Sequence, residues 1–83
     1  MTVESQIKDY IARNLLFSDN GFQYGDDASF LDEGIVDSVG VMELVAFVEE
    51  SFGIKVNDSE VTPDHFDSVS KLAAFIQNKT NKS

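Results

Sequence analysis

Residues 30–52 read FLDEGIVDSVGVMELVAFVEESF: a short loop with one glycine, followed by an amphipathic segment. Apolar side chains recur every three or four residues in the second part, which predicts a helix from about residue 38 to residue 52. Gly53 follows, and glycine is favoured just beyond a helix. At the start of the helix, the hydroxyl of Ser38 would lie beside unpaired N–H groups and the positive end of the helix dipole. That position suits a phosphate, although Asp37-Ser38 is also an ordinary helix cap.

The rest of the chain predicts further helices and no strand. Thr2 can cap a helix over about residues 3–16, and Thr62-Pro63 can open a short turn that ends at residue 66. Asp67 or Ser68 can cap a last helix whose apolar face holds Val69, Leu72, Ala73 and Ile76.

We therefore predict an all-α fold, a small bundle of three main helices and one short helix. The loop at about 17–36, between the first two helices, is long for so small a domain, and its apolar residues are expected to cover the core. Residues 1–78 form the single domain, and residues 79–83 are expected to be a polar, frayed tail.

A helical wheel divides the segment 38–52 into two faces. One face is expected to enter the core: Val41, Leu44, Val45, Val48 and Phe52. The opposite face mixes apolar side chains with carboxylates: Val39, Met42, Glu43, Ala46 and Glu50, flanked by Glu49. Carboxylates around exposed apolar groups suit docking of a basic protein, because the charges steer the partner and the apolar groups supply contact area.

Residues 31–45 (LDEGIVDSVGVMELV) and 49–56 (EESFGIKV) resemble the acyl and peptidyl carrier protein family, over about residues 30–77 in all. The resemblance implies that Ser38 carries a covalent 4′-phosphopantetheine arm, attached from coenzyme A by a phosphopantetheinyl transferase. The arm's thiol would carry an acyl or aminoacyl group as a thioester in fatty-acid, polyketide or amino-acid-activating biosynthesis.

The same resemblance implies the partners of a freestanding carrier: an acyl- or aminoacyl-loading ligase, and downstream synthases or transferases with basic docking patches. The residues implied in partner recognition are Asp37, Val39, Met42, Glu43, Ala46, Glu49 and Glu50. Gly40 is one departure, since many fatty-acid carriers have an acidic residue there. Glycine at this position is more similar to D-alanyl and some aminoacyl or peptidyl carriers.

Composition narrows the function classes. The 83 residues include no cysteine and one histidine, so thiol chemistry, zinc sites and histidine triads are disfavoured. The net charge is −9, and residues 19–67 hold 13 of the 15 acidic side chains against one lysine, which disfavours nucleic acid and anionic membranes. With no leader and no apolar run long enough for a membrane span, we expect a cytoplasmic monomer.

A serine hydroxyl is a weak nucleophile without a base, and no histidine or lysine lies near Ser38 in the sequence. Ser38 is therefore expected to be a substrate, and the chain no enzyme; His65 is expected to be structural. Two alternatives remain open. One is an unmodified, carrier-like acidic helical interaction subunit. The other is a calcium-responsive protein, although the acidic loop at 19–27 lacks calcium-loop spacing.

Overall fold

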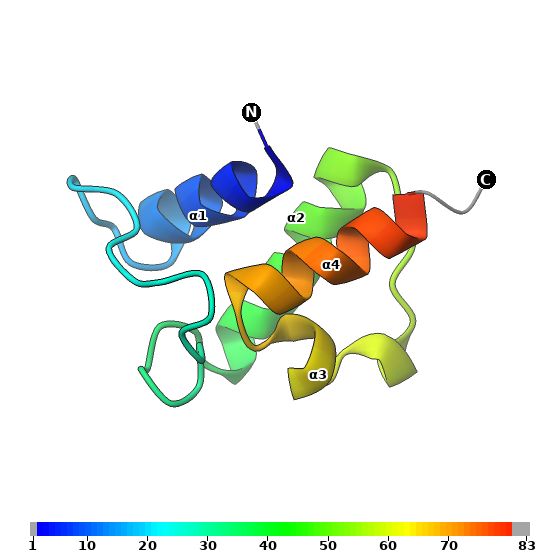
Figure 1. Cartoon of the computed structure of the whole chain (residues 1–83). Helices are drawn as coiled ribbons and strands as arrows, with labels where there is room; N and C mark the ends of the chain where they lie inside the picture. The colour runs from blue at the N-terminus through cyan, green and yellow to red at the C-terminus, as the bar shows by residue number, and fades with distance from the viewer. Residues whose placement is uncertain (1, 81–83) are drawn as a thin grey trace.

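The computed structural model describes residues 2–80 and is all-helical in that range, as predicted (Figure 1). A single-turn 3₁₀ helix, η1, was not predicted. The elements in chain order are α1 (Val3–Asn14), α2 (Ser38–Phe52), η1 (Asp58–Glu60), α3 (Pro63–Phe66) and α4 (Val69–Thr80).

The helices end at the signals that the sequence carries. The Thr2 hydroxyl accepts a hydrogen bond from the Ser5 N–H at 3.0 Å. Gly53 closes α2 in the left-handed conformation, with φ 64°. At α4, the Ser68 hydroxyl accepts from the Lys71 N–H at 3.1 Å, so Ser68 rather than Asp67 supplies the cap.

The core forms where α4 meets the other helices: α4 packs against α1, α2 and α3 (Figure 1). Its predicted apolar face is wholly buried. The main buried side chains are Ile7 and Ile11 of α1, Leu44 and Val48 of α2, and Val69, Leu72, Ala73, Phe75 and Ile76 of α4.

The orientation of α2 differs in part from the helical wheel. Leu44 and Val48 are buried as predicted, whereas Val41, Val45 and Phe52 are only partly buried at the edge of the core. On the other flank, the ring of Phe47 stacks on that of Tyr10 in α1, with centroids 4.2 Å apart. The wheel missed this contact because a partner on α1 cannot be read from the periodicity of α2.

The long loop between α1 and α2 covers the core in part. Phe30, Ile35 and Val36 are buried, and Phe22 packs partly against the core. Phe17 is the exception: its side chain is 80% exposed. The predicted covering role therefore holds for the second half of the loop and not for its beginning.

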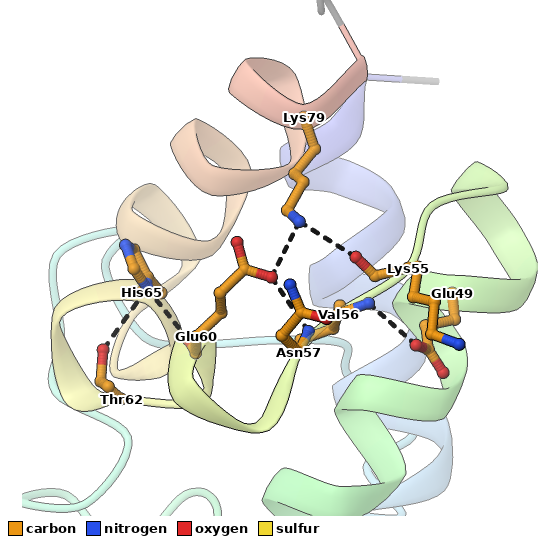
Figure 2. A network of polar contacts seen from close by, with 8 residues as sticks. All are labelled: Glu49, Lys55, Val56, Asn57, Glu60, Thr62, His65 and Lys79. Carbon is orange, nitrogen blue, oxygen red and sulfur yellow. Dashed lines mark hydrogen bonds and ion pairs between the residues drawn. The ribbon is translucent and has the colours of Figure 1, made fainter.

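A polar network ties the end of α4 to the connection between α2 and α3 (Figure 2). The Lys79 ammonium contacts the Glu60 carboxylate at 2.8 Å and donates to the Lys55 carbonyl at 3.1 Å. The same carboxylate accepts from the Asn57 N–H at 2.9 Å, and these hydrogen bonds, chiefly the one from Lys79, lower the pKa of Glu60. This anchoring continues α4 through Thr80, beyond the predicted start of the tail at residue 79. Residues 81–83 of that predicted tail lie outside the described residues.

His65 belongs to the same network and has a structural role, as expected. Its Nδ1 lies 2.9 Å from the Glu60 carbonyl oxygen, which can only accept, so Nδ1 carries the proton. Its ring packs on Phe75 with a centroid distance of 4.8 Å.

Candidate functional site

Ser38 is the first residue of α2, and its side chain is exposed. Asp37 caps the helix: its carboxylate accepts a hydrogen bond from the Gly40 N–H at 2.8 Å. The N–H groups of Ser38 and Val39 have no carbonyl one turn earlier within the helix, which leaves the helix end electropositive. The structure thus presents a hydroxyl beside backbone donors at the molecular surface.

The loop that leads to Ser38 is folded tightly around Phe30. The Phe30 carbonyl accepts from the N–H groups of Ile35 and Val36, at 2.8 and 3.3 Å. Gly34 makes the turn possible with φ 68°, a conformation that residues with a Cβ rarely adopt. Because Ile35 and Val36 are buried, the two residues before Asp37 are fixed to the core, and the start of α2 is held in place.

Asp67 holds this loop from the other side of the fold. Its carboxylate accepts from the Ser29 hydroxyl at 2.6 Å and from the Leu31 N–H at 3.0 Å, and its carbonyl accepts from the Phe30 N–H at 2.8 Å. Burial acts to raise the pKa of the Asp67 carboxyl, but these hydrogen bonds and nearby Lys71 hold it below its usual value. The sequence indicated Asp67 only as a helix cap, because its partners Ser29 and Leu31 lie more than 35 residues away.

We expect Asp67→Asn to destabilise the fold at neutral pH by about 1 kcal/mol, because the amide cannot replace both charge-assisted hydrogen bonds. Because the pKa of Asp67 is lower in the folded state, the ionised carboxylate contributes its full stabilisation at pH values above the unfolded-state pKa of about 3.9. This stabilisation is lost as the pH falls through the folded-state pKa. Urea unfolding at pH 7 and near pH 3 measures the difference, which should shrink in acid. An equal difference at both pH values would contradict this role.

Gly40 lies where three segments meet. A Cβ built there would stand 2.9 Å from Val36 Cγ1, 3.4 Å from an Asp37 carboxylate oxygen and 3.7 Å from Leu15 Cδ1. The first contact is closer than real Cβ contacts, and Val36 is buried and β-branched, so it has little freedom to move. Glycine at this position therefore reflects the close packing of the loop and α1 on the first turn of α2.

The exposed face of α2 carries most of the side chains that the wheel placed there. Val39 is 69% exposed and Met42 65% exposed. Glu43, Ala46 and Glu50 are exposed as well. We refer to these five residues as the α2 face.

Two further residues of the predicted recognition set have contacts within the chain. Glu49 is only partly exposed, and its carboxylate accepts from the Val56 N–H at 2.9 Å (Figure 2). Asp37 is exposed but caps α2. The helical wheel did not indicate the Glu49 contact, because Val56 belongs to the connection after α2.

Negative charge is concentrated beside Tyr10, at one edge of the α2 face. Burial raises the pKa of the Tyr10 hydroxyl, and the carboxylates of Glu43 and Glu50 raise it further. The hydroxyl donates to the Glu43 carbonyl at 3.3 Å. Glu43 and Glu50 therefore both add negative potential at the Tyr10 hydroxyl.

Two hollows border this region. A small, mostly apolar pocket of about 110 Å³ lies between the Phe30 loop, α2 and α3, with Phe30, Val41 and Phe66 in its wall. An open hollow lies between the end of α1 and the start of α2. Its lining includes Asp37, Val39 and Glu43, and no histidine, lysine or arginine of residues 2–80 is part of it. Of the two carboxylates in this lining, that of Asp37 accepts the hydrogen bond that caps α2.

Within residues 2–80, no three histidine, aspartate or glutamate side chains are grouped so that they could hold a metal ion. None of the described helices has the length and apolar character needed to cross a membrane.

The chain is similar to known proteins over most of its length. Residues 5–76 match the family model described as the phosphopantetheine attachment site. The chain is 35% identical over 81 residues to a D-alanyl carrier protein of Streptococcus uberis, a match that covers 98% of this chain and 99% of that protein. It is 40% identical over 57 residues to an acyl carrier protein of Buchnera aphidicola, which covers 69% of each chain.

Proposed function

Since this chain belongs to the phosphopantetheine-binding carrier protein family, we propose that Ser38 is its attachment site and that the chain is a freestanding acyl or aminoacyl carrier. The observation that carries the assignment is the exposed Ser38 hydroxyl at the first position of α2. The loop before it is clamped by Asp67 and by the buried Ile35 and Val36.

The residues around Ser38 fit a phosphopantetheine arm. Ser38 Oγ would hold the phosphate covalently, and the free N–H groups and dipole at the start of α2 favour its negative charge. The hydroxyl is exposed, so a modifying enzyme can reach it. When bound, the arm supplies a terminal thiol, which carries a carboxylic acid as a thioester.

In this proposal the chain presents the Ser38 hydroxyl for modification and then positions the arm; its own side chains catalyse no step. Asp37, the carboxylate next to Ser38 in the chain, caps α2, and no histidine or lysine lies near Ser38 in the sequence, so Ser38 is the substrate of a phosphopantetheinyl transferase in this proposal. The further proposed partners are a loading ligase and downstream synthases or transferases, met in the cytoplasm by a monomeric carrier. The acidic surface suits such transient contacts, because steering raises association rates without a large interface.

The packing around Gly40 favours an aminoacyl or peptidyl cargo over a long fatty acid. Many fatty-acid carriers have a carboxylate at this position, and here even a Cβ would require Val36 to move. The chain therefore presents no acidic side chain at this point of α2 for a fatty-acid enzyme to recognise. Two relatives named as D-alanyl carriers match over 98% and 93% of this chain, whereas a relative named as an acyl carrier protein is more identical, at 40%, but matches over 69%. The intact mass of the carrier purified from its natural host would identify the cargo.

The absence of cysteine provides a clean test of the proposed function. Any thiol that appears after incubation with a broad-specificity transferase and coenzyme A, followed by removal of free coenzyme A, must belong to the arm. We expect a thiol reagent to detect one thiol per chain, against none before treatment. No thiol would favour the alternative of an unmodified, carrier-like interaction subunit.

The α2 face is proposed as the docking surface for these partners. We expect Glu43→Lys with Glu50→Lys to slow modification by the transferase about tenfold at low salt, with the deficit shrinking as salt screens the charges. Both side chains are exposed, so stability should change by less than about 0.5 kcal/mol per substitution.

Asp9→Lys with Asp58→Lys is the matched control, because it makes the same change of net charge at exposed positions outside α2. The rate of modification is measured for both double variants at low and moderate salt. Equal rates for the α2 variant and the wild type at low salt would show that the acidic face only keeps the protein soluble.

A further inference from the structure

Phe17 combines two unfavourable features. Its side chain is 80% exposed, the largest exposed fraction among the exposed large apolar residues of the described chain. Its backbone has φ 51°, the only positive φ at a non-glycine residue among residues 2–80. Both features oppose folding relative to a glycine, which would avoid the strain and expose no aromatic ring. An exposed residue is ordinary by itself, but a bulky non-glycine residue held at positive φ is an outlier from which a functional hypothesis can start.

The backbone around Phe17 is held firmly. The Leu16 N–H donates to the Ile11 carbonyl at 2.9 Å, and the Ser18 N–H donates to the Ala12 carbonyl at 2.8 Å. These bonds wrap the end of α1 and fix the turn that projects Phe17 outward. Because the turn is already held by these bonds, less conformational entropy of the backbone is lost when a partner binds the ring.

Phe17 lies beside the start of α2. Together with Leu16 it lines the hollow whose other wall contains Val36, Val39 and Gly40. Asp37 and Glu43 line the same hollow, and no lysine or arginine in the described part of the chain does. An exposed ring and exposed Val39 therefore flank an acidic depression next to Ser38.

We propose that Phe17 and this hollow extend the docking surface beyond α2 and receive the transferase that modifies Ser38. This inference rests on the proposed function. The transferase would place an apolar side chain against Phe17 and Val39 and basic side chains against Asp37 and Glu43. The local charge favours a basic partner, since Asp37 and Glu43 line the hollow and no lysine or arginine of residues 2–80 does. Phe17 acts as an anchor, in the way that buried aromatic residues dominate many interfaces.

Phe17→Gly tests the proposal without an expected loss of folding, because glycine adopts φ 51° without strain. Its melting temperature should equal or exceed that of the wild type. With the unmodified protein as substrate, kcat/KM of the transferase should fall about tenfold, as expected for an interface anchor. The loss should lie in KM rather than kcat, since Phe17 contributes binding and no chemistry. Phe17→Leu keeps a large apolar side chain, so it should retain most of the wild-type kcat/KM.

Tyr24→Ala is the control, because Tyr24 is another exposed aromatic residue of the same loop and does not line this hollow. It should be modified at the wild-type rate. If Phe17→Gly is modified within twofold of the wild type, or if Tyr24→Ala loses as much as Phe17→Gly, the inference is overturned and the proposed function stands. If the wild type itself is not modified, the proposed function fails.

Discussion

Ser38→Ala is expected to remain fully folded and to acquire no thiol after incubation with a transferase and coenzyme A. The Ser38 side chain is exposed, and the α2 cap is the Asp37 carboxylate on the Gly40 N–H, which the substitution leaves intact. Alanine is also a good helix former at this position. The free energy of unfolding should therefore change by less than about 0.5 kcal/mol.

Ser51→Ala and Ser59→Ala serve as controls for this prediction. Both serines are exposed, but neither begins a helix after an aspartate. Each variant should acquire one thiol per chain at the wild-type rate. A thiol in Ser38→Ala would contradict the assignment of the site, and circular dichroism shows whether that variant has kept its helices.

Phe30→Ala is expected to cost about 3–5 kcal/mol of stability, a large share of what a domain of this size has. The Phe30 ring is 1% exposed and belongs to the core cluster formed by α1, α2 and α4. Its removal leaves a cavity under the loop that leads to Ser38. Urea unfolding followed by circular dichroism measures the loss.

Phe17→Ala is the matched control, because it removes the same ring from the exposed half of the same loop. Alanine keeps the positive φ strained, so the comparison isolates the loss of the ring. We expect a change within about 0.5 kcal/mol. Similar losses for both variants would contradict the view that Phe30 packs into the core and Phe17 does not.

The sequence predicted the helices well where local chemistry determines them. Thr2, Asp37 and Gly53 are signals within one turn of the helix ends they define, and the structure places those ends there. The apolar face of α4 was also predicted, because periodicity within one helix is a local property. The place of Ser38 at the start of α2 follows from the same kind of signal.

Contacts between distant segments could not be predicted. Asp67 holds Ser29 and Leu31 across more than 35 residues, and the ring of Tyr10 covers Phe47 from another helix. Near the end of α4, Lys79 contacts Glu60 and the Lys55 carbonyl, which lie 19 and 24 residues earlier in the chain. No periodicity or cap encodes such pairs, since they exist only when the helices have packed.

Gly40 shows the same limit at the site itself. In the sequence, glycine in a first helical turn indicates only that little helix stability is lost. The structure shows a steric reason for glycine at position 40, since Val36 occupies the space that a side chain would need. The reason involves a buried loop residue and so could be found only from the packed fold.

The central claim is that Ser38 carries the arm, and tandem mass spectrometry of the wild-type protein after treatment with a transferase and coenzyme A tests it most directly. We predict that the intact mass rises by one phosphopantetheinyl group and that fragmentation places this group on Ser38. An unchanged mass, or a group located on any other residue, would contradict the account.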